Sequence, residues 1–224
     1  MWPFVTRNRR LLNLSVHRDP PCYVRIPMLD FIEGTAAEIA VRLLGLTLTS
    51  HSPAGDVSLR ITEVEAYAGA EDAASHAYRG RTPRNEVMFG TGGVFYVYRS
   101  HGLHWCCNIV TGPPGVASAV LLRAGAIVAG EPLARQRRGG VVDAIRLARG
   151  PGNLAQALGI TGLDNWVSVI EGQRFALSGE SAASDSIAVG PRVGVTQASD
   201  VPWRFSISGE PTVSVYRRSP RADR

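Results

Sequence analysis

The sequence of 224 residues contains no lysine, because each of its 24 basic residues is an arginine. This absence excludes a lysine Schiff base, a lysine general base and the lysine of a phosphate-binding loop. Three cysteines are too few for the disulfide framework of a small secreted protein. Cys106 and Cys107 are adjacent in a predicted strand, so we expect reduced thiols that point to opposite faces of a sheet.

Long apolar runs are missing as well. No segment approaches the roughly 20 apolar residues that a membrane-spanning helix needs. The arginines near the start (Arg7, Arg9 and Arg10) are not followed by the apolar core of a signal peptide. We therefore expect a cytoplasmic protein that has no membrane partner. A hydrophobic content of 45% excludes a disordered chain and supplies enough material for a core.

Positive charge is concentrated in the middle of the chain. Ten arginines lie between Arg79 and Arg149, against only three acidic residues, whereas the net charge of the whole chain is +5. Such a segment favours a surface that faces a polyanion. Arginines that serve only as solvated cations would give the same excess, so charge alone leaves both interpretations open.

Periodicity predicts an α+β fold. Thr35 and Glu38 have the spacing of a capping box, which predicts a helix over 35–46. Alternation predicts strands at 57–67, 94–99, 105–111 and 117–123, the last three forming an antiparallel meander. Further along, the pattern predicts helices at 131–138, 142–148 and 153–158 and strands at 166–171, 203–208 and 212–217.

These elements indicate a single domain over 28–217, with a curved antiparallel β-sheet core and flanking short helices. Residues 1–27 contain prolines and scattered arginines without a sustained period, and we expect a flexible tail there. Residues 218–224 form a basic C-terminal tail.

The strand predicted at 57–67 has an unusual polar end. If it is regular, its face begins with Val57, Leu59 and Ile61 and ends with Glu63, Glu65 and Tyr67. A carboxylate deep in a sheet could serve as the base that activates a water molecule. A glutamate paired with a nearby arginine at a strand end would give the same pattern without catalysis.

Aromatic residues gather in a hairpin inside the basic segment, and they include Tyr96, Tyr98 and Trp105. Flat side chains beside arginines suit stacking on nucleobases, although aromatic residues in strands often only pack. The spacing His101-x-x-His104-x-Cys106 weakly suggests metal ligands, which leaves a metal-dependent hydrolase as one alternative.

Three longer strings, in order, identify a family. EVEAYAGAEDAASHAYRGRTPRN, MFGTGGVFYVYRSHGLHWCCN and AVLLRA resemble the alkyladenine (3-methyladenine) DNA glycosylases of the N-methylpurine type, with support from GPGNLAQALGI and PRVGV. The resemblance runs from about residue 30 to 217 and is strongest from 61 to 124. It implies a single mixed α/β domain that works on DNA without a metal or a cofactor.

The resemblance also implies roles for particular residues. Glu65 matches the general base that activates the attacking water, and Arg123 matches the arginine that helps to hold this water. Asn108 matches the residue that rejects guanine at its 2-amino group. The pocket that receives a flipped purine is expected to be formed by Tyr67, His76, Tyr98 and Asn108, with His76 also bonded to the base.

One position departs from the family pattern. His101 stands where the family usually has a tyrosine that wedges into the gap left by the flipped nucleotide. An imidazole is smaller, and it titrates near pH 6.5 when unperturbed. We therefore expect weaker base flipping and a DNA affinity that depends on pH. Arg84 and Arg99 are expected to contact the DNA as well.

The sequence thus predicts a monofunctional DNA glycosylase of base excision repair. Its expected partner is double-stranded DNA that contains alkylated or deaminated purines, such as 3-methyladenine, hypoxanthine or ethenoadenine, and the protein should act as a monomer near the nucleoid. Without a lysine, and unless the amine of the N-terminus takes its place, it should leave an intact abasic site. A damaged-DNA-binding protein without catalysis is the main alternative.

Overall fold

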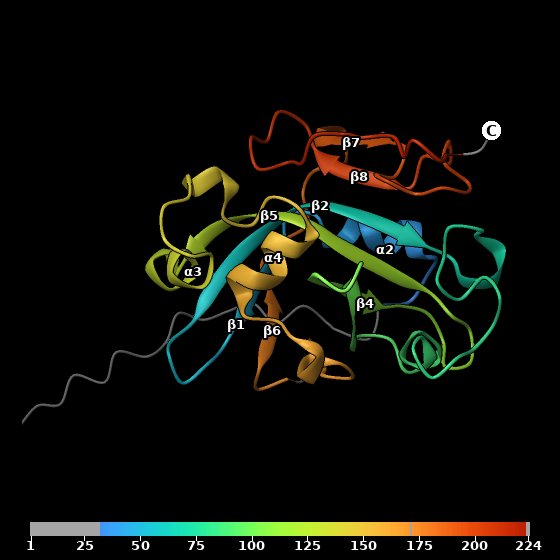
Figure 1. The fold of residues 1–224 in the computed structure, drawn as a ribbon, viewed down its shortest axis with the longest axis horizontal. Coiled ribbons are helices and arrows are strands. Elements are labelled where there is room, and N and C mark those ends of the chain that lie inside the picture. The colour runs from blue at the N-terminus through green and yellow to red at the C-terminus, as the bar shows by residue number, and fades with distance from the viewer. Residues whose placement is uncertain (1–31, 171, 223–224) are drawn as a thin grey trace, which may run out of the picture.

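The structure, a computed structural model, describes residues 32–170 and 172–222 (Figure 1). In these ranges an antiparallel sheet of eight strands is accompanied by short helices, which confirms the predicted α+β class. The α-helices are α2 (Ala36–Leu43), α3 (Glu131–Arg137) and α4 (Pro151–Leu158). The strands are β1 (Thr47–Ser50), β2 (Val57–Tyr67), β3 (Phe95–Ser100), β4 (His104–Val110), β5 (Ala119–Ala129), β6 (Phe175–Ser178), β7 (Ile187–Gly190) and β8 (Arg204–Ile207). The tail expected at 1–27 lies outside the described residues.

The two longest strands, β2 and β5, pair along most of their length and cross the middle of the molecule (Figure 1). On one side the sheet continues through β4 to β3, which confirms the predicted meander. The other edge of β2 is shared between two partners. Residues 57–60 of β2 pair with β1, whereas residues 63–65 pair with β8.

A double irregularity divides β2 at the point where its partner changes. Ile61 lies opposite Gly125, Glu63 opposite Ala124 and Val64 opposite Leu122, so Thr62 is an extra residue on β2 and Arg123 is an extra residue on β5. Each bulge reverses which side chains face the core.

The prediction of one regular face along β2 is therefore wrong. Val57, Leu59 and Ile61 enter the apolar core at odd positions, but after the bulge the core is reached by Val64 and Ala66. The reversal turns Glu63 and Glu65 away from the core, where unpaired carboxylates would be costly.

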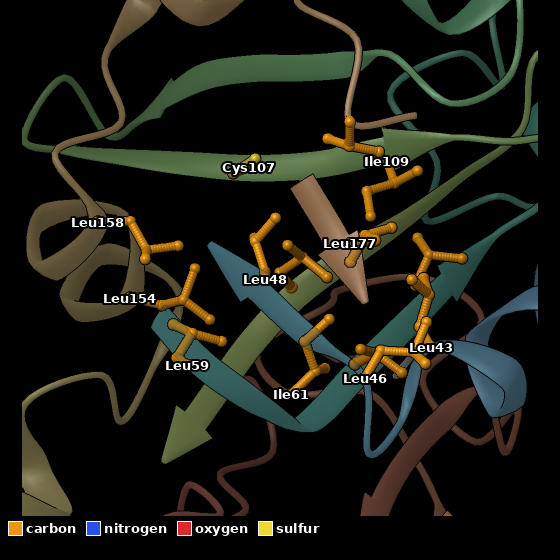
Figure 2. Packing of buried hydrophobic residues seen from close by; sticks show 14 of the residues in the cluster. Leu43, Leu46, Leu48, Leu59, Ile61, Cys107, Ile109, Leu154, Leu158 and Leu177 are labelled. Atoms are coloured by element: carbon orange, nitrogen blue, oxygen red, sulfur yellow. The ribbon is translucent and has the colours of Figure 1, made fainter. Parts of the chain in front are cut away.

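One apolar cluster forms the core on the other face of the sheet. Figure 2 shows Leu154 and Leu158 of α4 at one end of this cluster and Leu43 of α2 at the other, with side chains from β1, β2 and β6 between them. α2 begins with the predicted capping box, in which the Glu38 backbone N–H donates to Thr35 Oγ1 and the Thr35 N–H donates to the Glu38 carboxylate. α2 ends at Leu43, two residues before Gly45, whose φ is 89°.

Some predicted elements are absent from the structure. The helix at 142–148 is only a 3₁₀ turn at Ala144–Arg146, and 166–171 contributes a single bridge at Ser168. Residues 212–217 are not a strand, because backbone groups there bond to side chains, such as those of Glu63 and Arg204, instead of a neighbouring strand. Three short strands, β1, β6 and β7, were not predicted. No helix in the described ranges is long and apolar enough to cross a membrane.

Candidate active site

Glu65 lies fully buried on the second half of β2, at the wall of a pocket of about 670 Å³. Its Oε1 accepts a hydrogen bond from the Val193 backbone N–H (2.7 Å) and lies 3.3 Å from Nη1 of Arg123. Its Oε2 accepts a hydrogen bond from the Tyr67 hydroxyl (2.8 Å). A carboxylate has about four lone-pair sites. Two of them accept hydrogen bonds and a third faces the charge of Arg123, so one remains that can accept a hydrogen bond from a water molecule in the pocket.

Arg123 links this carboxylate to a second one. Its Nε donates to Oε1 of Glu63 (3.0 Å), while its Nη1 faces Glu65. Burial by itself would lower the pKa of Arg123, but the charges of Glu65 and Glu63 outweigh it and raise the pKa. The guanidinium therefore remains charged and is shared between two buried anions, in the fork geometry that only an arginine provides.

Glu63 is the more completely paired of the two carboxylates. It accepts hydrogen bonds from Nε of Arg204 (2.7 Å), from the Ser214 backbone N–H (2.7 Å) and from the Ser214 hydroxyl (2.9 Å). Burial would raise its pKa, but Arg123, the Ser214 N–H and Arg204 together hold the pKa below the ordinary 4.5. Glu63 is not part of the pocket wall, so it can position Arg123 without meeting a ligand.

Part of the pocket wall is aromatic. The Tyr96 and Tyr98 rings are stacked with centroids 5.5 Å apart, and the His76 ring meets Tyr98 edge-on at 4.5 Å. Nδ1 of His76 lies 3.0 Å from the Tyr96 hydroxyl. Burial raises the pKa of Tyr96 to about 12 and the pKa of Tyr98 as well, so both phenols stay protonated. Flat neutral rings of this kind can stack against another flat ring that enters the pocket.

His76 is solvent-exposed overall, yet the protein around its ring affects its protonation. Partial desolvation lowers the pKa of His76, and the nearby positive charge of Arg84 lowers it further. The imidazole is therefore neutral near pH 7. Asn85 fixes the loop that carries it, because its Nδ2 donates to the carbonyls of His76 (2.8 Å) and Gly80 (3.0 Å).

A buried ion pair fastens the Tyr67 side of the pocket. Nη1 and Nη2 of Arg192 donate to the two carboxylate oxygens of Asp72 at 2.5 and 2.8 Å, with both side chains inaccessible to solvent. The same guanidinium lies 4.8 Å from the centroid of the Tyr67 ring. Since Val193 is the next residue, one short segment orients both Tyr67 and Glu65.

The structure brings almost all the predicted site residues to one pocket. Its lining includes Glu65, Arg123, Tyr67, His76, Tyr98, Asn108, His101 and Arg84. Asn108 is buried, and its Nδ2 donates to the Tyr96 carbonyl (3.0 Å), so its amide is fixed in place. Arg99 is the exception, because it lies outside the lining and its guanidinium packs over Trp105 (5.2 Å).

The tip of the hairpin is exposed. His101 has a positive φ of 49°, with Nδ1 of its ring 3.1 Å from the Ser100 hydroxyl. Leu103, two residues on, is 71% exposed. Cys106 lines the pocket while Cys107 belongs to the core, so the prediction that they face opposite ways is confirmed. Among the described residues, no group of His, Cys, Asp or Glu side chains could hold a metal ion, and His101, His104 and Cys106 form no such cluster.

Sequence reasoning missed several residues that complete the site. Arg204, Ser214 and Val193 lie far along the chain from β2, and no spacing connects them to it. Glu63 was visible as part of a polar strand end, but its partner Arg123 could be assigned only once β2 and β5 were paired.

The residues 30–211 match the family model described as methylpurine-DNA glycosylase (MPG). The chain belongs to this family. It is therefore a DNA N-glycosylase, a DNA repair enzyme that acts on damaged DNA.

Bacterial relatives with the name "Putative 3-methyladenine DNA glycosylase" support this assignment. The protein of Rhodococcus jostii (strain RHA1) is 52% identical over 185 residues, which cover 80% of this chain and 81% of the relative. The protein of Mycobacterium tuberculosis (strain H37Rv) is 51% identical over 191 residues, with coverages of 82% and 90%. That of Mycobacterium leprae (strain Br4923) is 49% identical over 188 residues, covering 82% and 86%.

Proposed function

We propose that this methylpurine-DNA glycosylase flips alkylated or deaminated purines out of duplex DNA and hydrolyses the N-glycosidic bond with a water activated by Glu65. The observation that carries the proposal is the environment of Glu65, whose carboxylate is oriented by two hydrogen-bond donors and by the charge of Arg123 in an aromatic-walled pocket. The remaining lone pair can accept a proton from a water at the sugar carbon, and the negative charge stabilises the oxocarbenium-like sugar.

The aromatic wall suits the leaving group of this reaction. A purine alkylated at N3 or N7 carries a positive charge, so Tyr67 and Tyr98 attract it through their electron-rich faces, and it leaves without being protonated. The neutral His76 ring adds no competing charge next to such a base. With the Tyr96 hydroxyl as donor to Nδ1, His76 keeps its proton on Nε2 and can donate it to an acceptor on the base.

The experiment measures single-turnover base release from a duplex with one hypoxanthine and from methylated genomic DNA. Wild-type protein should release the damaged base, and Glu65→Gln should abolish release while it keeps DNA binding. Glu63→Gln is the matched control, because it changes a buried carboxylate two residues away that does not line the pocket, and it should retain measurable release. Lesion-selective binding without any release by the wild type would instead favour a damage-binding protein that does not cut.

The proposed reaction leaves an intact abasic site. A lyase step needs an amine that forms a Schiff base at the sugar carbon, and no lysine side chain is present to supply one. Product DNA should therefore stay unbroken until it is treated with alkali. Strand breaks that accompany base release, together with a borohydride-trapped protein–DNA adduct, would contradict this.

His101 is proposed to fill the gap left by the flipped nucleotide, because it stands exposed at the tip of the hairpin and also borders the pocket. Stacking on a base is worth about 1–3 kcal/mol, and a small ring stacks less than a phenol. The variant His101→Tyr should bind lesion DNA more tightly than the wild type at pH 8. Equal affinities of variant and wild type would refute this role.

A further inference from the structure

A second pocket, of about 590 Å³, lies beside the active site and is rich in arginine. Four arginines contribute to its wall, and we refer to it as the arginine pocket, defined by Arg138, Arg146, Arg149 and Arg217. The rest of its lining consists of short polar and aliphatic residues, including Ser214 and the first turn of α4. No residue that the proposed chemistry uses lies in it.

The four positive charges of the arginine pocket have no ion-pair partner among the described residues. No carboxylate lines this pocket, and none of the four arginines forms an ion pair with an acidic residue in the described ranges. Arg149 is anchored, because its Nε donates to the Val213 carbonyl (2.8 Å). Arg146 and Arg217 are exposed, and their side chains make no hydrogen bond with the described residues, so they are available to a ligand.

The arginine pocket and the active-site pocket share a thin partition at three places. Gly150 lines the arginine pocket, and its neighbour in the chain, Pro151, lines the active-site pocket. The backbone N–H of Gly194, in the active-site wall, donates to the Arg217 carbonyl (3.1 Å). Nη2 of Arg123 lies 3.4 Å from the hydroxyl of Ser214, which also belongs to the arginine pocket. A ligand that fills one pocket therefore lies next to the other.

The lining decides which part of a nucleic acid fits. The active-site pocket has three tyrosines and two histidines, whereas the arginine pocket has no aromatic ring on which a base could stack. Guanidinium groups bind phosphate oxygens through paired hydrogen bonds, and the amino end of a helix, here that of α4, adds to the attraction. The chemistry of the pocket is thus that of a phosphate site.

We propose that the arginine pocket binds backbone phosphates of the damaged DNA strand next to the flipped nucleotide, and this inference rests on the proposed function. Holding the backbone on one side of the partition keeps the sugar at the other side, where Glu65 lies. The active-site pocket thereby recognises the base, whereas the arginine pocket holds the strand independently of its sequence.

The test uses the double variant Arg146→Gln/Arg217→Gln, which removes two exposed charges outside the active-site pocket. Affinity for a hypoxanthine duplex is measured from 50 to 200 mM salt. Each phosphate contact contributes about 0.9 to the slope of log affinity against log salt on duplex DNA. We expect affinity at 50 mM to fall by at least tenfold and the slope to decrease by about 1 to 2.

The matched control is Arg218→Gln/Arg221→Gln, which removes two charges from the same stretch of chain but from side chains that line neither pocket. It should change affinity and slope much less. A pocket variant that binds like the wild type, or that loses no more than the control, would overturn the proposal.

Two further outcomes separate this inference from its alternatives. Inorganic phosphate that raises the Tm of the wild type but not of the pocket variant, together with unchanged DNA affinity, would assign the pocket to a free anion and overturn the DNA assignment. If the wild type releases no base while the pocket variant still shows the reduced salt slope, the catalytic proposal fails and the phosphate site stands.

Discussion

The two halves of β2 have opposite tasks although they belong to one continuous strand. Before the bulge, Val57, Leu59 and Ile61 contribute apolar side chains to the core, and β1 forms the neighbouring edge. After it, Glu63 and Glu65 face away from the core and β8 takes over that edge. The comparison shows that one inserted residue, matched by another on β5, is enough to place a charged site directly behind an apolar core.

Among changes to the second half of β2 and its partners, Arg123→Met should have the largest effect on activity and stability. This change leaves two buried carboxylates without the cation between them, and removal of one partner from a buried ion pair typically costs about 3–5 kcal/mol. We expect base release to be lost and the free energy of unfolding to fall by this amount, as measured by urea denaturation and single-turnover assays. The variant Arg123→Lys should recover part of the stability, since it restores the charge without the fork. Wild-type activity in Arg123→Met would contradict the proposed role.

The matching change in the first half is Leu59→Ala. Leu59 is completely buried, and truncation of such a leucine costs about 2–5 kcal/mol through lost burial and the cavity left behind. Urea denaturation should show this loss, whereas the single-turnover rate of the folded protein should stay close to the wild type. A rate that falls in parallel with stability would show that the two halves are not independent.

These contrasts indicate what a sequence can specify here. The bounds of β2 follow directly from its alternation, and the capping box locates the start of α2. The bulge could not be predicted, because Thr62 fits an alternating pattern and only the pairing with β5 reveals it as an extra residue. The short strands β1, β6 and β7 have four residues each and were missed, whereas β8, of the same length, was predicted.

The residues of the site also fall into those that the sequence could predict and those that it could not. Residues close together in the sequence, such as Glu65 and Tyr67, could be assigned to one pocket through the family motif. Val193 and Ser214 escaped prediction because they act through backbone N–H groups, which every residue except proline has. The strand predicted at 212–217 was wrong for the same reason, since its N–H groups serve a side chain and not a strand.

A subtler change within the second half is Tyr67→Phe. It removes only the hydroxyl that donates to Oε2 of Glu65 and leaves the ring available for stacking. A hydrogen bond to a charged group contributes about 1.5–3 kcal/mol, so the single-turnover rate should fall by about ten- to a hundredfold with little change in lesion affinity. Tyr96→Phe is the control, because its hydroxyl contacts His76 and not a carboxylate. Equal losses in both variants would argue against a specific effect on Glu65.

The smallest effect concerns acid stability. The pKa of Glu63 is lowered by Arg123, the Ser214 N–H and Arg204, which outweigh the effect of burial. Because the folded-state pKa lies below the unfolded value of 4.5, this stabilisation is complete above that pH and is lost as pH falls through the folded-state pKa. Urea midpoints between pH 7 and pH 3.5 should decline for the wild type. Glu63→Gln should decline less steeply, and parallel curves would rule out this contribution.

The contacts of Ser214 with Glu63 also bear on how the enzyme is made. They join positions 151 residues apart, so Glu63 and Glu65 leave the ribosome long before the backbone that completes their site. At about 5–20 residues per second, synthesis of the intervening chain takes roughly 8–30 s. During this interval the nascent protein has its core strand but lacks the Ser214 donors of its buried anions. A growing chain that meets DNA before Ser214 has been made therefore lacks a finished site, and base removal begins only after this residue has been added.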